Sequence, residues 1–160
     1  MDRSQSDSTE AVIKQFPNTT YLVEGGEVRS AGNLILTDRR LLFLKQVNLS
    51  QKQVQEIQEL VKESTTGKII QYSLKLHKKN FQLPLSSIVS AKMGLLSIIP
   101  LRPCLRVQYL SASKKIRILT FVFTLPLLKR LMLSEFPTLS WMQTIRKAIK
   151  AERKKGTPGH

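Results

Sequence analysis

The sequence has few of the residues on which enzymes and metalloproteins depend. A single cysteine, Cys104, excludes an internal disulfide and a cysteine-rich metal site. Of the two histidines, His160 lies in the tail, and His77 has no acidic residue close to it in the sequence with which to share a proton. Metal-ligand spacings, nucleophile-elbow motifs and phosphate-binding glycine loops are missing as well. We therefore expect a protein that is not an enzyme and that uses no metal or cofactor.

Long apolar runs are missing too. The longest uncharged apolar stretch, residues 118–128, is far shorter than the ~20 residues of a membrane-spanning helix, and Pro126 interrupts it. The first residues are polar and show no secretory signal. A chain of 160 residues with 41% hydrophobic residues is typical of one globular domain. We expect this domain to be cytoplasmic and peripheral on membranes.

Acidic residues are scarce in the second half of the chain. Residues 1–63 carry 9 acids and 8 bases, a net charge of −1, whereas residues 64–160 carry 2 acids and 18 bases, a net charge of +16. The whole chain has a net charge of +15. Such a field attracts phospholipid headgroups, nucleic acid or an acidic protein. The alternative is a basic surface that only aids solubility.

Short apolar segments with turn residues between them dominate the chain. These segments, of which those at 70–76, 81–85 and 105–109 also alternate with a period of two residues, predict about seven antiparallel strands. An irregular apolar loop is expected at residues 94–103. The segments predicted as strands lie at residues 21–23, 28–31, 34–37, 40–44, 70–76, 81–85, 88–93, 105–110 and 116–123.

Two helices are predicted before the end of the chain. Residues 11–16 are expected to form a short helix or turn, which Pro17 ends. Ser50 is a good helix cap, and valine and isoleucine recur after it at helical spacing. We therefore expect an inserted helix at about residues 50–64.

The C-terminal helix has the clearest pattern. It follows Pro137, and Trp141, Ile145 and Ile149 recur in it every four residues. Its last turns, at residues 146–155, are rich in lysine and arginine, which suits the negative end of the helix dipole.

Together these elements predict a mainly β fold with helices, of the α+β class. A bent antiparallel barrel of about seven strands leaves an open end, which the apolar face of the C-terminal helix can cap. We expect residues 1–18 to be a disordered or short-helix lead, residues 19–153 the domain, and residues 154–160 a basic tail.

Two motifs resemble those of a known family. Residues 32–43, Gly-Asn-Leu-Ile-Leu-Thr-Asp-Arg-Arg-Leu-Leu-Phe, resemble the hairpin of PH-like domains of the GRAM and GLUE type. Residues 83–88, Leu-Pro-Leu-Ser-Ser-Ile, resemble the strand that follows in those families. The resemblance covers roughly residues 21–152, and the nearest member is the GLUE domain of an ESCRT-II subunit. It implies a PH-like barrel that binds phosphoinositides and, in several lineages, ubiquitin, in assemblies for protein transport.

The first loop departs from the usual phosphoinositide pattern. In typical PH domains this loop is basic, whereas here it contains Glu24 and Glu27. Because two carboxylates repel an inositol phosphate, we expect an anionic lipid to bind the basic second half. The expected site lies around the predicted hairpin at residues 111–115, where converging cations can hold a phosphate. A solvated hairpin tip is the alternative. The expected anion-binding residues are Lys92, Arg102, Arg106, Lys114, Lys115 and Arg117.

The apolar loop before Pro103 is the second candidate site. Its residues Leu95, Leu96, Ile98 and Ile99 lie beside cations, and we expect them to insert into a bilayer interface. The alternative is that they cover the core.

The sequence therefore predicts a non-enzymatic domain that docks on anionic membrane lipid. Ubiquitin and other ESCRT-type subunits are partners that only the resemblance implies. A nucleic-acid-binding protein is the first alternative, but it needs stacking aromatics, and aromatic residues make up only 6% of the chain. A scaffold whose charge meets an acidic protein is the second alternative.

Overall fold

The computed structural model describes residues 10–23, 29–63, 66–97, 102–123 and 137–155. These residues form the expected α+β fold, with antiparallel strands and a C-terminal helix. The strands are β1 (Val12–Val23), β2 (Arg29–Thr37), β3 (Arg40–Lys45), β4 (Phe81–Pro84), β5 (Ile88–Ser97), β6 (Arg102–Leu110) and β7 (Ile116–Phe123). The helices are α2 (Gln51–Glu63), α3 (Thr66–Leu74), the short 3-10 helix η1 (Leu85–Ser87) and α5 (Pro137–Lys155).

The seven strands form one antiparallel sheet in the order β4-β3-β2-β1-β7-β6-β5. The first strand of the chain lies at its centre, between β2 and β7. The outermost strands are β4 and β5, which follow each other in the chain through η1 but do not pair. The sheet therefore has about the expected number of antiparallel strands but is not closed into a barrel.

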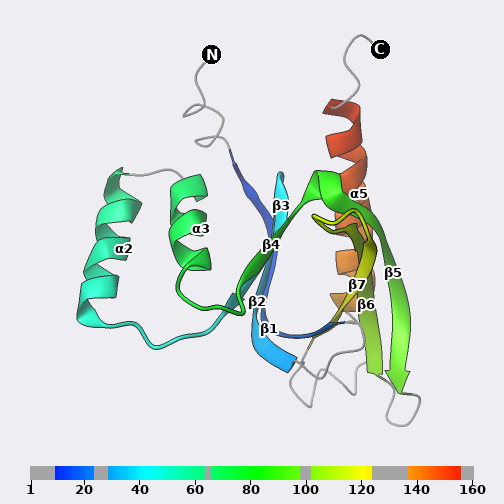
Figure 1. Cartoon of the computed structure of the whole chain (residues 1–160), viewed down its shortest axis with the longest axis horizontal. Helices are drawn as coiled ribbons and strands as arrows, with labels where there is room; N and C mark the ends of the chain where they lie inside the picture. The colour runs from blue at the N-terminus through cyan, green and yellow to red at the C-terminus, as the bar shows by residue number, and fades with distance from the viewer. Residues whose placement is uncertain (1–9, 24–28, 64–65, 98–101, 124–136, 156–160) are drawn as a thin grey trace.

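The described helices lie at opposite ends of the sheet. Figure 1 shows α2 and α3 next to each other beyond β3 and β4, and α5 at the other end, where it contacts β5, β6 and β7. Both α2 and α3 belong to an insertion between β3 and β4, of which the sequence predicted only the first helix. Ser50 begins α2 as expected, since its Oγ accepts a hydrogen bond from the Gln53 N–H at 3.2 Å.

The core lies between the sheet and α5. Trp141 is fully buried, and its ring stacks on Phe123 of β7 with the centroids 5.6 Å apart. Ile145 and Ile149 follow at four-residue steps and are buried in the same cluster. This apolar face fixes α5 on the sheet and leaves the lysines and arginines of the helix at its surface.

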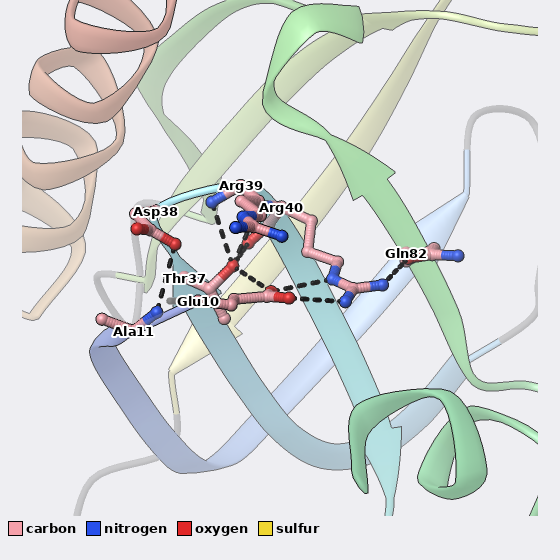
Figure 2. Close-up of polar contacts among 7 residues, drawn as sticks. All are labelled: Glu10, Ala11, Thr37, Asp38, Arg39, Arg40 and Gln82. Atoms are coloured by element: carbon pink, nitrogen blue, oxygen red, sulfur yellow. Dashed lines mark hydrogen bonds and ion pairs between the residues drawn. The ribbon is translucent and has the colours of Figure 1, made fainter. Parts of the chain in front are cut away.

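A buried ion pair holds the turn between β2 and β3 (Figure 2). Arg40 donates from Nε and Nη2 to the two carboxylate oxygens of Glu10, at 2.8 and 2.6 Å. The hydroxyl of Thr37 donates to the same carboxylate at 2.7 Å and accepts the N–H groups of Arg39 and Arg40. The Thr-Asp-Arg-Arg part of the hairpin motif is thus a structural device, as Arg40 ties the turn to the start of the domain.

The prediction of a helix or turn at residues 11–16 is wrong, because β1 begins at Val12. Pairing of this segment with β2 outweighs its local helical features. Pro17 does not end a helix but lies at a register shift of β1, between Phe16 and Thr19. Strands tolerate proline at such irregularities, where no ladder N–H is needed. The domain therefore begins before residue 19, and residues 1–9 of the predicted lead lie outside the described residues.

The strand predicted at residues 70–76 is also wrong, since α3 extends to Leu74. Ile70 and Leu74 are four residues apart, so they lie on one face of a helix as readily as on one face of a strand. Ile70 is buried. The amide of Asn80 donates to the carbonyl of Ser73 at 3.0 Å, which satisfies one of the free carbonyls at the end of α3.

Candidate functional site

The positive charge of the sequence collects on one half of the fold. Strands β5, β6 and β7, the turn between β6 and β7, and helix α5 together contain 12 lysine and arginine residues and one acidic residue, Glu152. An anion therefore meets an attractive field on this side of the molecule.

The turn between β6 and β7 presents two lysines. Lys114 N–H donates to Ser111 O at 2.8 Å, and Ser111 N–H donates to Lys115 O at 2.9 Å. Lys114 has a φ of 61°, a left-handed conformation that costs a residue with a side chain about 1 kcal/mol or more. Both lysine side chains are exposed, and neither has an ion-pair partner in the described part of the chain.

An exposed apolar pair lies at the base of this turn. Leu110 and Ile116 are cross-strand partners, and 43% and 59% of their surfaces are exposed. They lie on the face of the sheet opposite the core, because the alternating residues Val107 and Leu119 are in the core. We call the set Leu110, Lys114, Lys115 and Ile116 the hairpin surface. Its apolar half was not among the predicted site residues, although Ile116 and Ile118 on one face and Leu119 on the other indicate that β7 is apolar on both faces.

Two further predicted cations lie on this outer face. Lys92 of β5 and Arg106 of β6 are direct cross-strand partners, and both side chains are exposed. The Arg106 guanidinium lies over Gly94, where an added Cβ would be 3.0 Å from its Cζ. Like charges that face each other in this way destabilise a sheet. Within the described ranges neither has an ion-pair partner, so a bound anion would relieve their repulsion.

The structure does not bring all six predicted cations together. Arg117 pairs with Tyr109 and lies on the same face as the core residue Leu119, not on the outer face with Arg106. Arg102 is at the start of β6, eight residues before Leu110, which is roughly 27 Å along a strand. The expectation that Arg102 lies near the hairpin tip failed because the order of residues along β6 places it at the other end.

The first part of the apolar segment at residues 94–103 is a strand and not the expected loop. β5 extends to Ser97 and includes Leu95 and Leu96. The Leu95 side chain is 51% exposed, and the structure does not describe the side chain of Leu96. Ile98 and Ile99 lie outside the described residues. The exposure of Leu95 is consistent with the predicted membrane contact.

The basic end of α5 lies along the free edge of β5. Arg146 Nε donates to the carbonyl of Ala91 at 2.8 Å, and Arg153 Nη2 donates to the carbonyl of Val89 at 3.4 Å. An open groove of about 290 Å³, which we call the edge groove, separates the helix from the strand. It is lined by Val89, Ser90, Ala91, Arg146, Ile149, Lys150 and Arg153. The sequence predicted the basic helix end but not this groove, which depends on how the helix packs.

A smaller basic cluster surrounds His77 after α3. The His77 Nδ1 accepts the N–H of Lys79 at 3.0 Å. Desolvation, followed by the charges of Lys45, Lys79 and Lys78, lowers the pKa of His77 below its ordinary value of 6.5. The imidazole is therefore neutral near pH 7 and adds no charge to the cluster.

Neither the protein-family models nor the curated proteins contain a match to this chain. No helix in the described part of the chain is long and apolar enough to cross a membrane. Within the same residues, no group of three or more histidine, cysteine, aspartate and glutamate side chains is placed to hold a metal ion.

Proposed function

We propose that this protein is a non-enzymatic domain that docks on anionic membrane surfaces through the hairpin surface. The observation that carries the proposal is the exposed Leu110–Ile116 pair directly beside Lys114 and Lys115. Each cation near an anionic leaflet contributes about 1 kcal/mol. Aliphatic side chains that enter the interface contribute about 25 cal/mol for each Å² of apolar surface removed from water. Lys92 and Arg106 add charge on the same face.

The described aromatic residues favour a membrane over nucleic acid. A protein that binds single strands by stacking needs exposed rings. Every aromatic side chain within the described ranges is buried or half-buried, and most pack against one another, as Phe43 and Phe81 do with ring centroids 5.6 Å apart. The described residues of the positive half therefore offer cations and aliphatic groups but no stacking platform.

The resemblance to GRAM and GLUE domains supports phosphoinositides as the anionic lipid. Together with the positive charge, it also supports a peripheral location on cytoplasmic membrane faces in a trafficking or ESCRT-type assembly. Ubiquitin binding rests on the resemblance alone.

Vesicle co-sedimentation tests the proposal. The protein should bind vesicles of phosphatidylcholine with phosphatidylserine or a phosphoinositide, and should not bind phosphatidylcholine alone. Ile116→Ser should weaken binding about tenfold by the loss of apolar insertion. Val61→Ser is the matched control, because Val61 of α2 is 60% exposed but lies on the insertion. A parallel oligonucleotide shift at equal salt completes the experiment. Oligonucleotide binding without any lipid dependence would overturn the proposal.

A further inference from the structure

The edge groove lies along a strand that, among the described residues, has no neighbouring strand on one side. β5 ends the sheet, and the edge of a sheet presents backbone groups to which an extended chain can add as a further strand. The groove follows three consecutive residues of this edge, Val89 to Ala91. An extended segment of polypeptide that entered the groove would therefore lie against the edge of β5.

Side chains, rather than another strand, satisfy this edge. The carbonyl of Ala91 accepts Arg146 Nε, and the carbonyl of Val89 accepts Arg153 Nη2. Because N–H and C=O of one residue point to the same side of a strand, the Ala91 N–H also faces the groove. Side-chain bonds can be exchanged by rotation about side-chain torsions, without any change in the sheet. An incoming strand can thus displace the arginine side chains that cover this edge.

The charge of the groove indicates which kind of chain could displace the arginine side chains from this edge. Arg146, Lys150 and Arg153 are four and then three residues apart, so they form one stripe along α5. No carboxylate is among the groove-lining residues. Four helical residues rise about 6 Å, and alternate residues of a strand are about 7 Å apart. Carboxylates at every second position of an extended segment therefore come close to the spacing of Arg146 and Lys150.

We infer that the edge groove binds an extended acidic segment of a partner protein, which adds to β5 as a further strand. Its carboxylates pair with the guanidinium groups and Lys150, and its backbone takes over the carbonyls of Val89 and Ala91. This site shares no residue with the hairpin surface.

Fluorescence anisotropy with labelled synthetic peptides tests the inference. The probe is a short peptide of alternating glutamate and threonine. The same peptide with every backbone nitrogen methylated has the same charge but no backbone N–H donor, so it cannot pair as a strand. We expect the unmethylated peptide to bind at least about tenfold more tightly, a difference that charge alone cannot produce. Equal binding of the two peptides would overturn strand addition.

Two lysine variants on α5 locate the site. Lys150 lines the groove, whereas Lys147 is exposed on the same helix outside it, so Lys150→Glu and Lys147→Glu change the net charge equally. Lys150→Glu should weaken peptide binding at least about tenfold, and Lys147→Glu by less than about threefold. Hydrogen exchange of the Ala91 amide should slow when the peptide binds. Equal losses in the two variants, or unchanged exchange at Ala91, would contradict the inference.

Discussion

The Arg40 guanidinium holds both carboxylate oxygens of Glu10, and the carboxylate itself is completely buried. Burial, the largest single influence, raises the pKa of Glu10. The hydrogen bonds from Arg40 and Thr37, with the charges of Arg40 and Arg39, together outweigh it, so the pKa lies below its ordinary value of 4.5. This ion pair joins the segment before β1 to the β2–β3 turn, and its state of protonation is therefore coupled to folding.

Stability should fall in acid because of Glu10. A carboxyl group whose pKa is lower in the folded protein stabilises the fold above pH 4.5 and loses that contribution as the pH falls through the folded value. Glu10→Gln removes this titration. The free energy of unfolding of the variant should therefore depend less on pH between about 5 and 2 than that of the wild type. Urea unfolding followed by Trp141 fluorescence measures both, and parallel curves would show that Glu10 does not carry the acid sensitivity.

Removal of Arg40 should be more damaging than loss of the Glu10 charge. Arg40→Ala leaves the Glu10 carboxylate buried without its cation, which costs about 3 kcal/mol or more of unfolding free energy. Arg117→Ala is the control, since this exposed arginine has no ion pair with any described residue and its removal should cost less than about 0.5 kcal/mol. Similar losses of unfolding free energy in the two variants would mean that the buried pair does not stabilise the fold more than an exposed arginine does.

Lys114→Gly should separate docking from stability. Glycine adopts a φ of 61° without strain, so the free energy of unfolding should stay constant or rise by up to about 1 kcal/mol. The midpoint of thermal unfolding should therefore not fall. Loss of one cation at the membrane should weaken binding to phosphatidylserine vesicles about fivefold. A variant that binds vesicles as tightly as the wild type would remove Lys114 from the docking site.

Lys92→Glu should act in opposite directions on the two properties. Glutamate opposite Arg106 replaces a repulsive cross-strand pair with an attractive one, which should stabilise the sheet by about 0.5 kcal/mol. The same change reverses a charge on the outer face, so vesicle binding should weaken. Lys92→Gln, which only removes the repulsion, should lie between. If Lys92→Glu is less stable than the wild type, the two side chains do not interact as their register indicates.

Local patterns predict much of this fold. The segments at 34–37 and 40–44 are short apolar runs on either side of the tight turn at Asp38 and Arg39, and the structure has β2 and β3 there. The four-residue repeat from Trp141 likewise predicts α5. Residues 70–76 fit two periods at once, and only packing against the rest of the chain selects the helix over the strand. β1 is recognised only through its partners, because Pro17 ends a helix as readily as it marks an irregular strand.

In the candidate site, too, local patterns predict some features and tertiary packing decides the others. The lysines of the hairpin tip follow from sequence, since turn residues separate two alternating segments. The position of Arg102 far from the hairpin tip and the pairing of Leu110 with Ile116 both depend on where β6 begins and how it is aligned with β7. The edge groove depends on where α5 crosses the end of the sheet, a tertiary relationship that no local pattern of residues 146–155 contains.

The most direct test of membrane docking places an environment-sensitive label on the hairpin. In a Cys104→Ser background, Ser113→Cys labels the turn beside Lys114, and Gln58→Cys labels the exposed side of α2 as a control. On phosphatidylserine-containing vesicles, the emission of the hairpin label should shift to the blue as it enters the interface, while that of the α2 label stays constant. A shift of the α2 label alone, or no shift of the hairpin label when the protein is bound, would contradict docking through the hairpin surface.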